Sequence, residues 1–189
     1  MHVAAVILAA GASTRLGEPK QLVTLAGEPL LKRAIRIATQ AGCARAIVVL
    51  GASATAILDQ CNLSPAQVVI NEAWQEGMAS SIRAGITALA GTADAAILMT
   101  CDQPAVTAEH LAILIHKGRD LEDVVGSSYG EMRGVPAYFP GTRFSELLVL
   151  AGVIGARHLL ASSYTIPLSG GELDIDTPSA LAAARKIYE

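Results

Sequence analysis

The chain has few charged and few aromatic side chains. Only 16% of its 189 residues are charged, the formal net charge is -3, and 4% of the residues are aromatic. Proteins that bind nucleic acid through counterion release carry a basic surface, and single-strand binders carry aromatic platforms on which bases stack. The composition therefore predicts no nucleic-acid partner, and any polyanion should bind in a local cationic pocket.

Paired cysteines and long apolar runs are also absent. The three cysteines, Cys43, Cys61 and Cys101, form no C-x-x-C pair, so neither a disulfide framework nor a thiolate zinc site is indicated. No apolar stretch has the length needed to cross a bilayer, and the run at 3–10 lacks the basic leader of a signal peptide. We expect a cytoplasmic protein with no membrane partner.

Two common catalytic patterns are missing. The histidines show no H-E-x-x-H spacing, and no G-x-S-x-G elbow supplies a serine nucleophile. We expect His110 and His116 on the surface of a helix, without a function.

Hydrophobic residues make up 52% of the chain, which is enough for the core of one domain. Apolar runs and helical segments alternate, as is typical of a parallel sheet with helices on both faces. We expect an α/β fold, a three-layer α/β/α arrangement around a mostly parallel twisted sheet. A single domain should span 1–189, with a nucleotide-binding half at 1–118 and an acceptor-binding half at 119–189. The expected strands lie near 3–9, 45–51, 67–70, 94–100, 122–127, 134–139 and 163–168, and the expected helices near 29–41, 53–61, 78–90, 107–117, 143–150, 155–161 and 178–188.

The segment that follows the first apolar run has the composition of a phosphate-binding loop. Small residues at 9–13 allow backbone N–H groups to converge on an anion, and Arg15 and Lys20 supply positive charge. The spacing of Gly11 and Gly17 fits neither G-x-G-x-x-G nor a Walker loop. An ordinary turn would explain the glycines and the serine but not the two cations.

Acidic residues occur at two distant places. Asp102 follows a buried run at the carboxyl end of a predicted central strand, where ligands of open α/β sheets bind. Asp174 and Asp176 precede the last helix. Mg²⁺ is commonly held by one or two carboxylates together with substrate phosphates, although Asp102 could instead cap a turn and Asp176 or Thr177 could cap the helix.

The segment 71–81 offers polar side chains before a helix, where N–H groups are exposed. Such an edge can hold a base or ribose, and it could equally be a capped loop with Trp74 packed on the core.

These motifs together resemble the molybdenum cofactor nucleotidyltransferases, within the larger group of nucleotidyltransferases that share the glycosyltransferase-A-like fold. The matching pieces run along the whole chain in the family's order: Leu8-Ala9-Ala10-Gly11-x-Ser13-x-Arg15-x-Gly17-x-x-Lys20-Gln21-Leu22, Asn71, Gly77-Met78-x-x-Ser81, Asp102-Gln103-Pro104, Gly134-x-Pro136, Gly155-Ala156-Arg157 and Asp174-x-Asp176-Thr177-Pro178.

The resemblance implies transfer of a nucleoside monophosphate to a phosphorylated acceptor, molybdopterin, with release of pyrophosphate. Ala9-Ala10-Gly11 favours CTP over GTP, because the guanylyl branch usually has two successive glycines there. A molybdenum hydroxylase is an implied partner. The implied roles are catalytic for Arg15, Lys20 and Asp102, Mg²⁺-binding for Asp102 and Asp176, nucleotide-binding for Leu8, Ala9, Ala10, Gly11, Ser13, Arg15, Lys20, Asn71, Gly77 and Ser81, and acceptor-binding for Gly134, Pro136 and Arg157.

The chain departs from the family on the acceptor side. Val135 stands where the family usually has His, and Val153, in Gly152-Val153-Ile154-Gly155, stands where it has Asp. The acceptor and the oligomeric state therefore stay open. Alternatives are a cytidylyltransferase for a sugar or polyol phosphate and a non-catalytic nucleotide-binding partner of a molybdenum hydroxylase. The glycine spacing disfavours a nicotinamide-dependent oxidoreductase.

Overall fold

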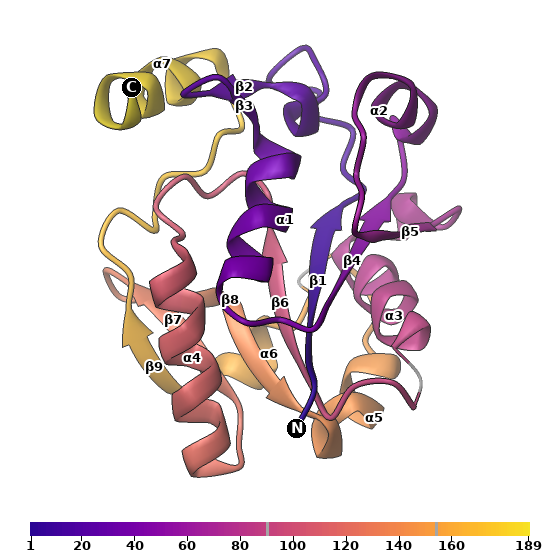
Figure 1. Ribbon diagram of the computed structural model, residues 1–189, viewed down its shortest axis with the longest axis vertical. Helices are drawn as coiled ribbons and strands as arrows, with labels where there is room; N and C mark the ends of the chain where they lie inside the picture. The colour runs from indigo at the N-terminus through magenta and orange to yellow at the C-terminus, as the bar shows by residue number, and fades with distance from the viewer. Residues whose placement is uncertain (90, 154) are drawn as a thin grey trace.

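A central sheet of seven strands, in the order β5-β4-β1-β6-β8-β7-β9, organises the molecule (Figure 1). The computed structural model describes residues 1–89, 91–153 and 155–189. A separate two-stranded sheet is formed by β2 and β3. The strands are β1 (Val3–Ala9), β2 (Thr24–Leu25), β3 (Glu28–Pro29), β4 (Arg45–Leu50), β5 (Gln67–Ile70), β6 (Ala95–Thr100), β7 (Val125–Tyr129), β8 (Met132–Pro140) and β9 (Tyr164–Pro167).

Helices cover both faces of the sheet because its central strands are apolar on both sides. Alternate side chains of a strand point to opposite faces. Ile7 of β1 joins a core with α1 and α4, whereas Val6 joins a second core with α3. The helices are α1 (Leu30–Gln40), α2 (Ala54–Gln60), α3 (Met78–Ala88), α4 (Ala108–Leu121), α5 (Phe144–Leu148), α6 (Arg157–Leu160) and α7 (Pro178–Tyr188).

A third, smaller core joins the two ends of the chain. Leu16 and Leu25, from the first segment after β1, pack with Ile175 and Leu181 from the last segment. Figure 1 shows α7 beside β2 and β3, at the end of the sheet toward which β1 points. The C-terminal segment is therefore held next to the loop that follows β1.

The predicted α/β class and the mostly parallel sheet are confirmed, with one exception in strand direction. β8 runs antiparallel to its neighbours β6 and β7, whereas the pairs formed by β1, β4, β5 and β6 are all parallel. The direction reverses because β7 and β8 form a hairpin through Gly130, which has a φ of +58°. The short β2–β3 hairpin has no counterpart among the predicted elements. Of the helix expected at 78–90, residue Ala90 lies outside the described residues.

His110 differs from the prediction of a surface position. Its side chain is buried, and its Nε2 donates to Ser127 Oγ at 2.8 Å, while the Ser127 hydroxyl donates to the Pro136 carbonyl at 2.6 Å. Burial lowers the pKa of His110, which keeps the imidazole neutral. The residue contributes to the packing of α4 on the sheet, and His116 on the same helix is exposed as predicted.

Within the described part of the chain, no helix combines the length and the apolar character that crossing a membrane would require.

Candidate functional site

The loop after β1 is held in one conformation by its own hydrogen bonds. Ser13 has a φ of +54°, and its carbonyl accepts hydrogen bonds from the N–H groups of Leu16 and Gly17, each at 3.1 Å. Its side-chain Oγ accepts from the N–H of Lys20 at 3.1 Å. Gln21 is buried, and its Nε2 donates to the Ala9 carbonyl at 2.6 Å. These bonds determine where Lys20 leaves the backbone.

Lys20 connects the two acidic segments. Its Nζ donates to Asp102 Oδ2 at 2.7 Å and to Asp176 Oδ1, although these partners are 82 and 156 residues away in the sequence. Arg15 Nη2 reaches Asp176 Oδ2 at 2.7 Å. The backbone also joins the two acidic segments, since the Ile175 N–H donates to the Asp102 carbonyl at 2.9 Å. The structure thus brings together two cations and two carboxylates that the sequence analysis selected.

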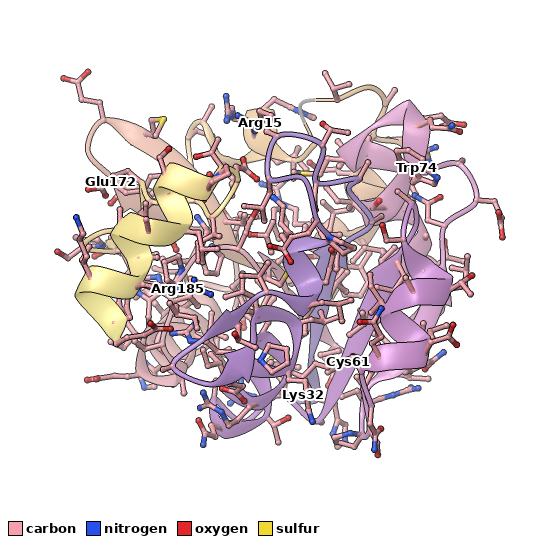
Figure 2. All side chains as sticks on the ribbon, turned by 90° about the horizontal axis from the view of Figure 1, so that it is seen from above. Arg15, Lys32, Cys61, Trp74, Glu172 and Arg185 are labelled. Atoms are coloured by element: carbon pink, nitrogen blue, oxygen red, sulfur yellow. The ribbon has the colours of Figure 1, made fainter. Side chains whose placement is uncertain are left out.

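The geometry also separates the local alternatives for the acids. Thr177 Oγ1 accepts from the N–H of Ala180 at 3.2 Å and therefore caps α7, with Pro178 in the first turn. The Asp176 carboxylate is left to pair with the cations. In Figure 2, which looks down from above, Arg15 lies between Glu172, on the segment before α7, and Trp74, on the segment before α3.

The charge state of Lys20 follows from its neighbours. Burial by itself would lower the pKa of the amine, but the ion pairs and hydrogen bonds with Asp102 and Asp176 together raise it above its ordinary value. Lys20 is therefore a permanent cation. Its side chain is 15% exposed, so solvent screens this charge only partly.

Asp174 adds a third carboxyl group. Partial burial raises its pKa from 3.8 to about 6, and the negative charges of Asp102 and Asp176 act in the same direction. The cluster therefore places three carboxyl groups beside two cations, and its negative charge disfavours ionisation of Asp174.

The acids suit a divalent cation without forming a complete ligand set. Asp102 Oδ1 is buried and has no hydrogen-bond partner among the described residues, and a hard cation would satisfy such an oxygen. In the described ranges, no group of three or more His, Cys, Asp or Glu side chains is arranged to hold a metal. Asp102 and Asp176 could therefore hold a divalent cation only together with ligands from elsewhere, such as phosphate oxygens or water.

Two neighbouring cavities meet at this cluster. The first, which we call the loop cavity, has a volume of about 220 Å³ and is lined by the end of β1, the following loop and the start of α3. The predicted nucleotide-binding residues among its lining are Leu8, Ala9, Ala10, Gly11, Lys20, Gly77 and Ser81.

The second cavity, which we call the valine cavity after Val135 and Val153, has a volume of about 560 Å³. Its lining combines the charged residues with residues from α3, β8 and α6. Lys20 and Asp102 line both cavities. The predicted site residues on its lining are Arg15, Lys20, Asp102, Gly134, Arg157 and Asp176.

Three predicted site residues lie outside both linings. Ser13 supports Lys20 from the loop, and Pro136 lies buried in β8. Asn71 stands behind the loop cavity, where its Nδ2 donates to Ser80 Oγ at 2.8 Å and to Ser81 Oγ at 3.0 Å. The structure thus places these three residues next to the cavities but not on their linings.

Gly77 combines two constraints. Its φ is +104°, and a Cβ at this position would lie 2.8 Å from the Val153 Cα. The loop before α6 thus approaches the start of α3 so closely that only a glycine fits.

Gln21 and Tyr129 lie at the site, although the sequence patterns predicted no role for them. Gln21 directly follows Lys20 in the motif that runs from Leu8 to Leu22, and this position could have indicated its role in holding the loop. Tyr129 lines the valine cavity from β7, and no pattern in the sequence around it indicated that position.

Comparisons with known proteins relate the sequence and the fold of the chain to those of other proteins. A family model described as the MobA-like NTP transferase domain matches residues 5–166. The chain is 34% identical over 166 residues to nicotine blue oxidoreductase of Paenarthrobacter nicotinovorans, which covers 84% of this chain and 81% of that protein. The crystal structure of Rv0371c from Mycobacterium tuberculosis H37Rv matches with a TM-score of 0.88 and 30% identity over 98% of both chains. A structure of Rv0371c in complex with manganese matches with a TM-score of 0.83 and 28% identity, over 98% of this chain and 99% of that chain.

Proposed function

Because this chain belongs to the MobA-like NTP transferase family, we propose that it transfers CMP from CTP to a phosphorylated small-molecule acceptor and releases pyrophosphate. The observation that carries the proposal is the convergence of Lys20 with Asp102 and Asp176 at the cavity formed by the loop after β1. Positive charge held beside small residues at a strand end suits a triphosphate.

The chemistry needs no nucleophile from the protein. An oxygen of the acceptor phosphate attacks the α-phosphorus in line, a P–O bond forms, and the bond to the bridging oxygen of the pyrophosphate breaks. A phosphate monoester is ionised near neutral pH, so the residues act by positioning and by neutralising charge. Arg15 and Lys20 stabilise the negative charge that builds on the phosphate oxygens.

We assign the divalent cation to Asp102 and Asp176. When bound, Mg²⁺ would neutralise phosphate charge and help to align the triphosphate. The orphaned Asp102 Oδ1 supports this assignment, as does the complex of the related Rv0371c with manganese.

Molybdopterin is the acceptor that the family resemblance favours, and a molybdenum hydroxylase is the corresponding protein partner. The CTP preference rests on Ala9-Ala10, where the chain lacks successive glycines. The acceptor and the CTP preference are independent of the transfer reaction, so an experiment can refute either one and leave the transfer reaction standing.

A matrix of nucleotides and acceptors tests the proposal. CTP, GTP, ATP and UTP are combined with molybdopterin, with sugar phosphates, with polyol phosphates and with no acceptor, and pyrophosphate is measured with Mg²⁺ or Mn²⁺. We expect pyrophosphate with CTP only when an acceptor is present. Triphosphate binding without pyrophosphate in every well would instead identify a non-catalytic nucleotide-binding protein.

The relative from Paenarthrobacter nicotinovorans supports a second candidate function, because its name describes an oxidoreductase. The loop after β1 argues against it, since Gly11 and Gly17 do not form a dinucleotide fingerprint. The deciding measurement is oxidation of NADH by this protein with the dye nicotine blue as electron acceptor. We expect no turnover above the rate without protein, and dye-dependent turnover would replace the transferase proposal.

A further inference from the structure

Part of the valine cavity is lined only by apolar side chains. These residues come from α3, β8, the segment before α6 and α6 itself. They are Met78, Ile82, Val135, Val153, Ala156 and Leu160.

Ile82, Ala156 and Leu160 belong to one buried core, and Val135 packs against this core. A Cβ built on Gly155 would lie 2.8 Å from Met78 Sδ and 3.5 Å from Ile82 Cδ1, so the segment carrying Val153 packs directly on α3. The Ala79 N–H donates to the Gly152 carbonyl at 3.3 Å and holds this segment in place.

The outer members of this apolar lining are open to solvent. Val153 is 74% exposed and Met78 is 40% exposed, whereas Ile82 and Leu160 beneath them are each 1% exposed. Large apolar side chains that stay exposed inside a cavity are typical of a surface that a ligand covers.

The neutral polar groups of this cavity are few and mostly occupied. Gln103 Nε2 donates to the Gly171 carbonyl at 3.3 Å, and its Oε1 lies 3.5 Å from Thr100 Oγ1. The charged side chains lie on the other part of the lining, so hydroxyl groups of a ligand placed against Val135 and Val153 would lose the hydrogen bonds that they make with water.

Given the proposed transfer reaction, on which this inference rests, we propose that the acceptor is a phosphate monoester with an apolar aromatic ring, in place of the molybdopterin that the family resemblance favours, and that Val135 and Val153 determine this specificity. Arg15 and Arg157 line the same cavity and can hold the phosphate. The ring packs on the two valines, and Tyr129, on the lining of the same cavity, supplies an aromatic contact.

Binding of simple phosphate esters tests the inference without any need for catalysis. 1-Naphthyl phosphate, glycerol 3-phosphate and inorganic phosphate are titrated into the full-length protein by calorimetry, with no nucleotide present. We expect 1-naphthyl phosphate to bind at least about tenfold more tightly than glycerol 3-phosphate. Equal affinities, or tighter binding of glycerol 3-phosphate, would overturn the inference.

Threonine substitutions locate the preference on the valines. Val135→Thr with Val153→Thr keeps size and charge but adds hydroxyl groups, so the ratio of the two affinities should fall at least about fivefold. Val149→Thr, at a position that is 80% exposed and outside the cavity lining, is the matched control and should leave the ratio unchanged. An unchanged ratio in the double variant contradicts the assignment. If the double variant does not fold, Val153→Thr alone is measured, because that side chain is solvent-exposed.

The transfer assay separates the two proposals. A preference for 1-naphthyl phosphate in binding, without pyrophosphate release for any acceptor, would refute transfer and leave an aromatic-ester site. Pyrophosphate release with polyol phosphates but not with aryl phosphates would refute the acceptor class and leave transfer intact.

Discussion

The loop cavity and the valine cavity share Lys20 and Asp102 but are constructed differently. All residues that line the loop cavity come from the first 102 positions, at the ends of β1 and β6 and in the segments beside them. The valine cavity takes residues from both halves of the chain, including Arg15 at one end and Asp176 at the other. The lining of the loop cavity therefore lies entirely before the expected division at 118, whereas the lining of the valine cavity includes residues on both sides of it.

This difference suggests a separate task for each cavity. The loop cavity includes the backbone and small side chains of the segment that follows β1, Ala10 and Gly11 among them, and any triphosphate presents the same charge to it. The valine cavity presents side chains, so two substitutions can change what it binds. We therefore expect variants near the loop to change the reaction and variants at the valines to change the acceptor.

The largest expected effect comes from Lys20→Ala. Losing one positioned charge should reduce the rate of pyrophosphate release by about 10²–10³. The assay is steady-state pyrophosphate release with saturating CTP and Mg²⁺. Lys32→Ala, at an exposed lysine on α1, serves as the control, and a normal rate for the Lys20 variant would remove this residue from the mechanism.

Gly77→Ala should disturb both cavities, because it forces a strained φ and a clash with Val153. We expect a loss of at least about 2 kcal/mol in the free energy of unfolding, measured by urea denaturation. Gly42→Ala has a φ of +89°, nearer to that of Gly77, and no neighbouring atom within 4 Å, so it reports the strain of a positive φ without the clash. Equal losses for the two variants would mean that the Val153 contact is unimportant.

Asn71→Ala tests whether this residue supports the loop cavity from behind. Removing its bonds to Ser80 and Ser81 and the bond that its Oδ1 accepts from the Ala73 N–H should lower stability by about 1–2 kcal/mol. CTP binding should weaken in parallel. Asn62→Ala, at an exposed asparagine, is the control, and weaker CTP binding with unchanged stability would point to direct contact with the nucleotide.

Asp174→Asn gives the smallest and most pH-dependent effect. The unfolded carboxyl titrates near its ordinary value of about 4, and the folded one titrates at about 6. The folded protein therefore binds more protons between these values, and its stability falls as the pH rises from about 4 to about 6. At pH 7 the variant should have the higher Tm.

This Tm difference should disappear at pH 4, where Asp174 is protonated in the folded protein. The corresponding difference in the free energy of unfolding should be below about 1 kcal/mol, because solvent screens a partly exposed group. Asp59→Asn, on α2 and outside both cavities, is the control. A Tm difference that does not depend on pH would contradict the raised pKa of Asp174.

Local sequence patterns predicted most of the fold. The expected strand at 3–9 is the observed β1, and the expected helix at 178–188 is the observed α7. These elements follow from apolar periodicity and from the Thr177-Pro178 start signal, which act over a few residues. The reversed direction of β8 was not predicted, because strand direction depends on which strands pair and not on composition.

The same contrast holds for the site. The sequence by itself determined the strand and loop at the N-terminus, the cations Arg15 and Lys20, and the acids at the ends of predicted elements, because these depend on neighbouring residues. Only the tertiary structure decided that Asp176 reaches Lys20 and that Val135 and Val153 line one cavity. Such contacts join segments that are far apart in the chain, and packing of the cores around the sheet, rather than any local preference, brings them together.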